Sequence, residues 1–126
     1  MSTRAQKAGA AGIVIDGKFR DINEHRDLGI GLYARGMSVL GSNSFTRSSE
    51  LNTSVAYKIK ELSNAEVHVR SGDLIMGDAD GVVAIPPEMA EQCVELCESR
   101  WAIDEATREC LENGEDIGPT IKKLRT

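Results

Sequence analysis

The sequence predicts an α/β protein with a small sheet or β-barrel core, flanking helices and a long helix near its C-terminus. Three observations predict it. A helical stretch leads directly into a continuously apolar strand, as in α/β units where such strands are covered on both faces. Several short strand patterns then follow between turn signals, which is typical of a compact antiparallel or mixed sheet, or of a small barrel. The last third has the apolar spacing of one long amphipathic helix.

The N-terminal third contains one expected helix and two expected strands. Residues 2–10 have the pattern of a short helix. The apolar run at 12–15 predicts a buried strand. A second apolar run, at 30–34, ends at Arg35-Gly36, and we expect it to be a neighbouring strand.

The middle of the chain alternates between loop and strand patterns. Residues 41–53 are rich in Ser, Asn and Thr and predict a long loop, which is more often functional than idle. Strands are expected after it, separated by turns of Ser, Asn, Gly and Asp. The expected strand ranges are 54–59, 65–69, 73–76 and 82–85.

The C-terminal part begins with Pro86-Pro87, which favours the first turn of a helix. Apolar residues recur along one side of this helix, which we expect to run to about residue 113. They are Met89, Cys93, Leu96, Cys97 and Trp101, with Ile103 as a further candidate. Asn113-Gly114 is a stop signal, and a short terminal segment follows.

Length and composition limit the classes of function. A chain of 126 residues allows one domain, which we assign to residues 1–126. The net charge of −5 argues against a nucleic-acid binder. No window reaches the run of about 18 apolar residues that a membrane span requires, and no secretory signal is visible. Three cysteines, an odd number, argue against a disulfide framework and for a reducing, cytoplasmic location.

Two of the cysteines are spaced one helical turn apart. Cys93 and Cys97 could hold a metal at this spacing, but no His or further Cys nearby completes a tetrahedral set. Packing in the core is the better interpretation.

Several charged residues follow the first expected strand. Asp16, Arg20, Asp21 and Glu24 are expected to lie in one loop after the strand's carboxyl end, where α/β folds gather ligands. Carboxylates can hold Mg²⁺ or Mn²⁺ through oxygen, and a guanidinium can bind a substrate carboxylate. The alternative is a solvated loop with a local ion pair of little energetic value, which the spacing alone favours.

Two further features bear on that choice. Arg35 follows the second strand, so two parallel strand ends would each present an Arg to an anion pocket; the alternative is a surface Arg before a turn glycine. Asp73, Asp78 and Asp80 form an acidic cluster, which turn chemistry explains. The cluster lacks the closing Glu of an EF-hand loop, so calcium is rejected.

The histidines and serines give little evidence for a catalytic site. His25 could carry protons near the charged loop, although a loop-surface His is preferred. His68 alternates with valines and is expected to face solvent. Ser44 and Ser48 have no convincing His or Asp partners, so a serine nucleophile is remote.

The combined motifs resemble a known family. They are AGAAGIVIDGKFRD followed by INE, then LYARG, then SGDLIMGDADGVVAIP and an acidic long helix. Together they resemble the regulator of ribonuclease activity A (RraA) family, and within it the 4-hydroxy-4-methyl-2-oxoglutarate / 4-carboxy-4-hydroxy-2-oxoadipate aldolases. The resemblance implies an αββα sandwich or small barrel similar to swivelling phosphohistidine domains. Related sequences carry a methyltransferase label, but no glycine-rich strand-to-helix loop for S-adenosylmethionine is present.

The resemblance also implies roles for the charged residues. Arg20, Asp21 and Glu24 match the family's Arg-Asp-x-x-Glu/Asp motif. Asp21 would be a ligand of Mg²⁺ or Mn²⁺, Arg20 would bind and polarise the pyruvyl group, and Glu24 would be a further ligand or support the first. Asp16 and Arg35 remain additional candidates. The implied reaction is retro-aldol cleavage of a small 2-oxo acid to pyruvate, with oxaloacetate decarboxylation at the same site.

The chain departs from the family in one respect. The first residue of the motif should stand about twenty residues before Arg20, which falls before Met1. We therefore expect a chain that lacks the family's N-terminal segment, which puts catalysis in question.

The competing class is a non-catalytic binding protein. In the ribonuclease-regulating branch the scaffold binds a ribonuclease or helicase, and the acidic residue after the Arg is usually missing. Asp21 and Glu24 are both present here, which favours the aldolase branch. The resemblance further implies homotrimers, or hexamers made of paired trimers.

Overall fold

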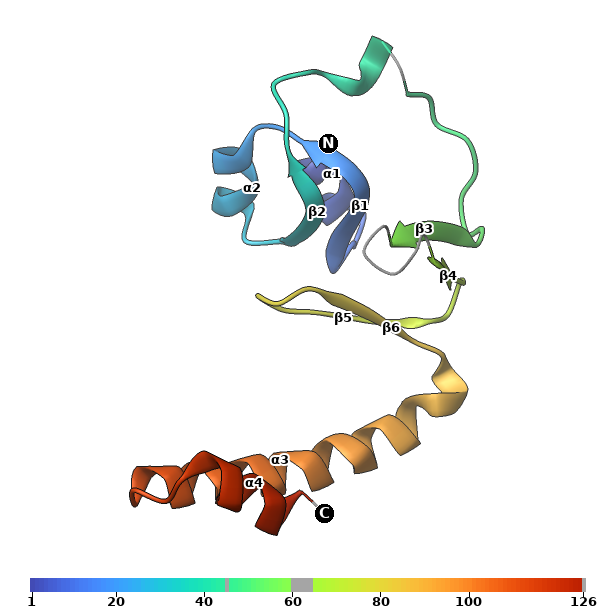
Figure 1. The fold of residues 1–126 in the computed structure, drawn as a ribbon. Helices are drawn as coiled ribbons and strands as arrows, with labels where there is room; N and C mark the ends of the chain where they lie inside the picture. The colour runs from blue at the N-terminus through green and yellow to red at the C-terminus, as the bar shows by residue number, and fades with distance from the viewer. Residues whose placement is uncertain (45, 60–64, 126) are drawn as a thin grey trace. The chain divides into compact units, whose positions relative to one another are not determined.

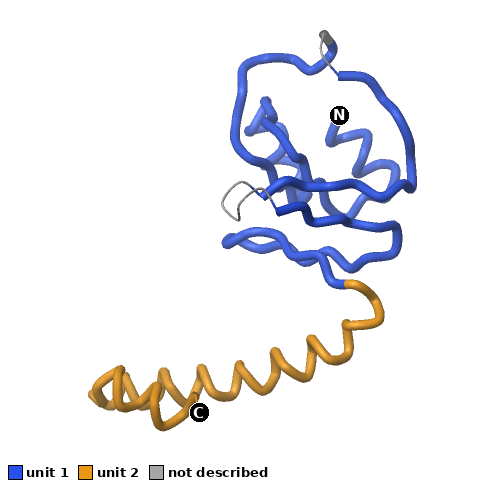
Figure 2. The backbone as a smooth tube through the Cα atoms, turned by 45° about the vertical axis from the view of Figure 1, so that its right-hand side comes forward, with its two compact units in different colours: residues 1–85 blue, residues 86–126 orange. Residues whose placement is uncertain are grey.

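The computed structural model describes residues 1–44, 46–59 and 65–125. Helices and strands are mixed along the chain, and a long helix lies near the C-terminus (Figure 1). The chain divides into two compact units, residues 1–85 and residues 86–126 (Figure 2). The expected α/β class and long helix are confirmed.

The first unit begins with two helices and two parallel strands. In order they are α1 (Ser2–Lys7), β1 (Gly12–Phe19), α2 (Ile22–Leu28) and β2 (Gly31–Met37). The strands lie side by side, from Gly12 opposite Gly31 to Phe19 opposite Met37 (Figure 1). Parallel strands need a crossover connection, and α2 provides it. The carboxyl end of β1 therefore leads straight into α2.

The prediction of one charged loop after residue 15 was wrong. β1 continues through Asp16 to Phe19, and α2 begins at Ile22. Asp-Gly is a turn signal in sequence, but pairing with β2 keeps the strand extended, with a register irregularity between Ile15 and Lys18. Arg35 likewise lies inside β2 rather than at its end.

The expected run of short strands is confirmed. The strands are β3 (Val55–Ile59), β4 (Ala65–Val69), β5 (Leu74–Gly77) and β6 (Val82–Ile85). β3 pairs with β4 and β5 with β6, both antiparallel. Within the described residues the strands form three separate two-stranded sheets, so the sandwich and the barrel stay predictions. In the described part of the segment 41–53, residues Ser42–Ser44 form a 3-10 turn, η1.

Aspartates of the acidic cluster stabilise turns, as expected from the sequence. Asp78 Oδ1 accepts hydrogen bonds from the backbone N–H groups of Asp80 and Gly81, at 2.9 and 3.2 Å. Asp73 Oδ2 accepts one from the N–H of Arg70 at 2.8 Å. These carboxylates stabilise the turns before β5 and β6, as Asp side chains do in tight turns.

The second unit consists of helices. Pro86 precedes a 3-10 turn, η3 (Pro87–Met89), which leads into α3 (Ala90–Glu112) and then α4 (Ile117–Leu124). The long helix and its proline start are confirmed, and α4 was not predicted as a helix. Arg125, just after α4, pairs with Asp104 of α3. No helix in the described part of the chain has the length and apolar character needed to cross a membrane.

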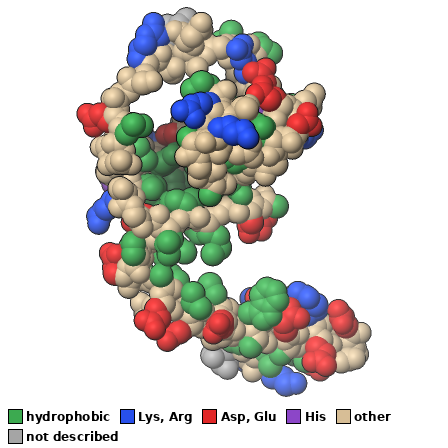
Figure 3. Space-filling model, turned by 180° about the vertical axis from the view of Figure 1, so that it is seen from behind, with side chains coloured by type: hydrophobic (Ala, Val, Ile, Leu, Met, Phe, Trp, Pro, Cys, Tyr) green, Lys and Arg blue, Asp and Glu red, His purple; other side chains and the backbone are tan. Residues whose placement is uncertain are grey.

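Burial differs from the expected core. Among the described residues no hydrophobic side chain is buried; the buried ones are Ser2, Thr107 and Thr120. Trp101 is 70% exposed, and Cys97 is exposed rather than packed in a core. Figure 3 shows hydrophobic side chains on the surface of both units. Apolar surface of this extent is typical of chains that bury it against another chain or segment.

Candidate functional site

The turn between β1 and α2 carries the two central residues of the expected site. Arg20 Nε lies 3.3 Å from Asp21 Oδ2, and the two side chains are 55% and 57% exposed. An ion pair so exposed contributes at most about 1 kcal/mol to folding. The pair therefore leaves both groups accessible to solvent without contributing much to the stability of the fold.

Asp21 has an unusual backbone conformation. Its φ of 64° and ψ of 44° lie in the left-handed region, which costs a non-glycine residue about 1 kcal/mol. Among the described residues only Asn52 shares a positive φ without being glycine. Such conformations concentrate at functional sites.

The spacing of Asp21 and Glu24 also fits a helix-capping pair, in which both side chains bond to free N–H groups of the helix start. In the structure, neither carboxylate bonds to the helix start in this way. Asp21 precedes α2 but makes no side-chain cap hydrogen bond. Glu24 Oε1 instead accepts a hydrogen bond from the hydroxyl of Thr3 on α1, at 3.0 Å. The two carboxylates are thus not used to cap α2.

His25 was expected to be a surface residue in a loop, and the structure places it elsewhere. It lies on α2, is half-buried, and forms a hydrogen bond between Nε2 and the carbonyl oxygen of Arg20 at 2.9 Å. Its ring meets Phe19 edge to face, with centroids 5.2 Å apart. Ile22, His25 and Leu28 share the half-buried side of α2, and their three-residue spacing is the sequence signal that could have identified it.

Gly41 is a second residue that the sequence reasoning missed. A Cβ built on Gly41 would lie 3.3 Å from Nη1 and 3.5 Å from Cζ of Arg20. The segment after β2 therefore passes close against the guanidinium. A glycine in a polar loop gives no sequence signal for such an approach.

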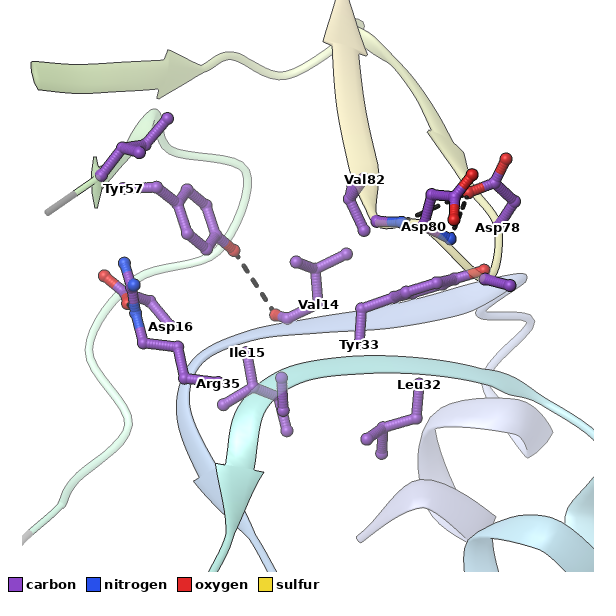
Figure 4. A pocket seen from close by; sticks show the side chains of 14 residues that line it. Val14, Ile15, Asp16, Leu32, Tyr33, Arg35, Tyr57, Asp78, Asp80 and Val82 are labelled. Atoms are coloured by element: carbon purple, nitrogen blue, oxygen red, sulfur yellow. Dashed lines mark hydrogen bonds and ion pairs between the residues drawn. The ribbon is translucent and has the colours of Figure 1, made fainter. Parts of the chain in front are cut away.

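Asp16 and Arg35 form a separate group. They make an ion pair, and Arg35 also donates to the carbonyl oxygen of Lys58. Both line an open cavity of about 820 Å³ (Figure 4). Arg20 and Asp21 are not among its lining residues, so Arg35 and Arg20 have different surroundings. Their joint anion pocket stays a prediction.

Two tyrosines help to form this cavity. Tyr57 donates a long hydrogen bond, 3.4 Å, to the carbonyl oxygen of Val14, which Figure 4 shows as a dashed line. Burial raises the pKa of the Tyr57 phenol above its usual 10.0, and the Asp16 carboxylate raises it further. Tyr33 lies against Gly77, where an added Cβ would be 2.6 Å from Cζ of the ring.

The remaining candidates do not gather around the turn. His68 lies on β4 with its side chain 58% exposed, 3.7 Å from Glu66, which confirms that it faces solvent.

No cluster of three or more His, Cys, Asp or Glu groups suited to a metal exists among the residues that the structure describes. Mg²⁺ needs fewer protein ligands, because it keeps several waters and commonly binds one or two carboxylates. The accessible oxygens of Asp21 fit that mode, with Glu24 one helical turn away.

Comparison with known proteins gives three similarities in sequence. The family profile described as "RraA-like: Aldolase/RraA" matches residues 1–84. A Halalkalibacterium halodurans protein named as a candidate 4-hydroxy-4-methyl-2-oxoglutarate aldolase is 33% identical over 109 residues, 86% of this chain and 48% of its own. An uncharacterised protein of Methanocaldococcus jannaschii is 28% identical over 116 residues, 92% of this chain and 52% of its own. The chain spans about half the length of the curated relatives it matches.

The fold is also similar to that of a solved structure. A crystal structure of an uncharacterised protein from Pseudomonas syringae pv. tomato matches with a TM-score of 0.77 at 23% identity. The match covers 95% of this chain and 56% of the other. It supports the mixed helix-and-strand architecture with its long C-terminal helix. The assignment of all 126 residues to one domain stays a prediction, since the family profile ends at residue 84.

Proposed function

Because the chain belongs to the Aldolase/RraA family, we propose that it is a divalent-metal-dependent aldolase. Its substrates would be 2-oxo acids of the 4-hydroxy-4-methyl-2-oxoglutarate type, cleaved to pyruvate. The observation that carries this proposal is the left-handed Asp21, which makes no helix-cap hydrogen bond and keeps its carboxylate beside the Arg20 guanidinium. The name of the 33% identical relative supports the choice of reaction.

The charged residues of the turn and of α2 have different roles in the proposed reaction. Arg20 binds the carboxylate and 2-oxo group of the substrate, since a guanidinium donates several hydrogen bonds in a fixed plane. Asp21 would hold Mg²⁺ or Mn²⁺, and Glu24, oriented by Thr3, would be a further ligand or support Asp21. The ion, when bound, would supply Lewis-acid polarisation of the 2-oxo group.

Arg20 would act mainly on the charge that develops during cleavage. As the bond between C3 and C4 breaks, its electron pair moves into the pyruvate enolate, and the C4 hydroxyl passes its proton to solvent water and becomes a carbonyl. The enolate then takes up a proton at C3 to give pyruvate. Arg20 stabilises the enolate oxygen electrostatically, which lowers the barrier. Oxaloacetate would lose CO₂ at the same site, because decarboxylation leaves the identical enolate.

We propose that the protein works in the cytoplasm as a homotrimer, or as a hexamer of paired trimers. The exposed apolar side chains of both units support an assembly, since a lone chain leaves them in contact with water.

A second candidate function is a non-catalytic, protein-binding regulator of RNA processing. One observation favours it: the exposed apolar side chains, which a partner protein would cover. Metal binding at Asp21 separates the two candidates, because the regulator does not need it.

The test is release of pyruvate from oxaloacetate and from 4-hydroxy-4-methyl-2-oxoglutarate, with Mg²⁺, with Mn²⁺ and with EDTA. Asp21→Asn removes the proposed ligand. Asp27→Asn is the matched control, because it removes the same charge from the exposed surface of α2 outside the motif. We expect release that EDTA and Asp21→Asn abolish and that Asp27→Asn leaves intact. Absence of release from a folded protein, or release that Asp21→Asn leaves unchanged, would overturn the proposal.

A further inference from the structure

The turn that carries Arg20 and Asp21 is fixed by hydrogen bonds to three consecutive carbonyl groups, and the last of them, the carbonyl of Asp21, accepts from the backbone N–H of His25 at 3.3 Å. The carbonyl of Phe19 accepts from the N–H of Ser38 at 2.7 Å. The carbonyl of Arg20 accepts from Nε2 of His25 at 2.9 Å. The bond to Phe19 continues the pairing of β1 with the chain after β2. The bond to Arg20 has no counterpart in strand or helix and depends on one side chain.

The bond to Arg20 determines the tautomer of His25. A carbonyl oxygen can only accept, so Nε2 must carry the hydrogen. In a neutral imidazole the other nitrogen, Nδ1, is then unprotonated. Nδ1 is buried and has no hydrogen-bond partner within the described residues, and the ring makes a T-shaped contact with Phe19. A buried Nδ1 without a partner cannot exchange protons readily with a substrate, so this geometry does not suit the proton carrier considered from the sequence.

Helix α2 holds the imidazole in place because α1 anchors it at two points. Thr3 donates to Glu24, and Gln6 Nε2 donates to the carbonyl oxygen of Leu28 at 2.9 Å. His25 lies between these anchor points. The contacts between the two helices therefore help to set the position of the ring, together with its contact with Phe19.

We propose that His25 is a positioning residue for the Arg20–Asp21 turn. Its Nε2–H bond fixes the carbonyl that links Arg20 to Asp21, and so stabilises the left-handed conformation of Asp21 against the extended conformations that a non-glycine residue prefers. The Asp21 carboxylate and the Arg20 guanidinium are thereby held ready for their ligands. The consequence for catalysis rests on the proposed function; the conformational role does not.

Three variants test the proposal. His25→Leu removes the donor and keeps apolar contact with Phe19. His25→Gln places an amide N–H near the position of Nε2 and should restore the bond. His68→Leu controls for loss of a histidine, because His68 is exposed on β4.

The first measurement is NMR on the metal-free protein. The ¹⁵N shifts of the imidazole identify which nitrogen carries the hydrogen, and residual dipolar couplings at Asp21 report its backbone conformation. We expect hydrogen on Nε2, a left-handed Asp21 in the wild type and in His25→Gln, and a changed Asp21 in His25→Leu. Hydrogen on Nδ1 in the wild type, or an unchanged Asp21 in a folded His25→Leu, would overturn the proposal.

The second measurement is Mn²⁺ affinity together with kcat and KM for oxaloacetate. Loss of a group that orients a ligand weakens metal binding by about tenfold or more, so His25→Leu should lose about tenfold in Mn²⁺ affinity and in kcat/KM. His25→Gln should recover most of both, and His68→Leu should match the wild type. If the wild type neither binds Mn²⁺ nor releases pyruvate, the proposed function fails, while the NMR result still decides the role of His25.

Discussion

The Thr3 hydroxyl on α1 donates a hydrogen bond to Oε1 of Glu24 on α2, with the two oxygens 3.0 Å apart. This contact joins two residues that are 21 positions apart in the sequence, and it orients a carboxylate of the Arg-Asp-x-x-Glu motif. Thr3 lies outside the motif, yet through this hydrogen bond it should influence the proposed metal site.

Replacing Thr3 by Val removes the hydroxyl and keeps the shape of the side chain. We expect pyruvate release from oxaloacetate at limiting Mg²⁺ to fall about two- to tenfold, the range that one hydrogen bond accounts for. Thr3→Ser retains the donor and should remain near wild type. Equal loss in both variants would indicate that packing, rather than the hydrogen bond, matters at this position.

Gly41 should control access of the Arg20 guanidinium to its substrate. In Gly41→Ala the new Cβ would lie 3.3 Å from Nη1, so the guanidinium must shift by a few tenths of an ångström. We expect KM for oxaloacetate to rise several-fold and Mn²⁺ affinity to stay unchanged, because Arg20 binds the substrate and not the metal.

The matched control is Gly17→Ala on β1, whose Cβ would make an ordinary 3.7 Å contact with Ile15. It should leave KM near the wild-type value. A Gly41→Ala variant that loses metal binding and keeps KM would contradict the assignment of roles within the turn.

The contact between Tyr33 and Gly77 should be a point of tight packing. An alanine Cβ at position 77 would lie 2.6 Å from Cζ of the Tyr33 ring, so the ring or β5 must move. We expect Gly77→Ala to lower the free energy of unfolding by about 1–3 kcal/mol, as overpacking does. Urea denaturation measures it.

A double-mutant cycle isolates the cause. Tyr33→Ala removes the ring, so Gly77→Ala should cost far less in that background, with a coupling above about 0.5 kcal/mol. Additive losses would show that the two residues do not compete for the same space.

Tyr57 should make stability depend on pH in the alkaline range. Burial and the Asp16 carboxylate raise the pKa of its phenol above 10.0, so the folded chain favours the protonated form more than the unfolded chain does. This stabilisation is fully present below the unfolded pKa of about 10 and is lost as the pH rises through the raised folded pKa.

Tyr57→Phe removes the ionisation. Its free energy of unfolding should therefore fall less than that of the wild type when the pH is raised from about 9 to about 11. Parallel urea titrations at both pH values measure the difference. An identical fall in both proteins would contradict the assignment.

The sequence predicts the strands and the long helix better than the elements around the site. The strands from β3 to β6 follow from alternation between turn residues, and α3 follows from Pro86-Pro87 and its apolar spacing. These signals are local, and the structure agrees with them to within a few residues.

The segment between residues 15 and 29 was predicted poorly because its structure depends on contacts made elsewhere. Asp16-Gly17 is a turn signal, yet pairing with β2 keeps it in a strand. The seven-residue helix α2 has only Ile22, His25 and Leu28 on its half-buried side, too few to stand out among charged neighbours. No sequence pattern predicts the left-handed Asp21, because an aspartate adopts that conformation only where its surroundings support it.

Apolar patterning predicted a buried core that the described residues do not have. On the side of α3 that was expected to be apolar, Trp101 is 70% exposed, and the buried residue of this helix is Thr107. Patterning indicates which side chains favour burial, but not whether the same chain buries them.

A titration with Mn²⁺ alone, monitored by paramagnetic broadening of backbone amide signals in NMR spectra, tests directly for a metal site at the Arg20–Asp21 turn. We expect saturable broadening centred on Asp21 and the start of α2, lost in Asp21→Asn and retained in Asp27→Asn. Broadening centred elsewhere, or broadening that Asp21→Asn leaves unchanged, would contradict a metal site at the Arg20–Asp21 turn. That result would favour the protein-binding function over the aldolase.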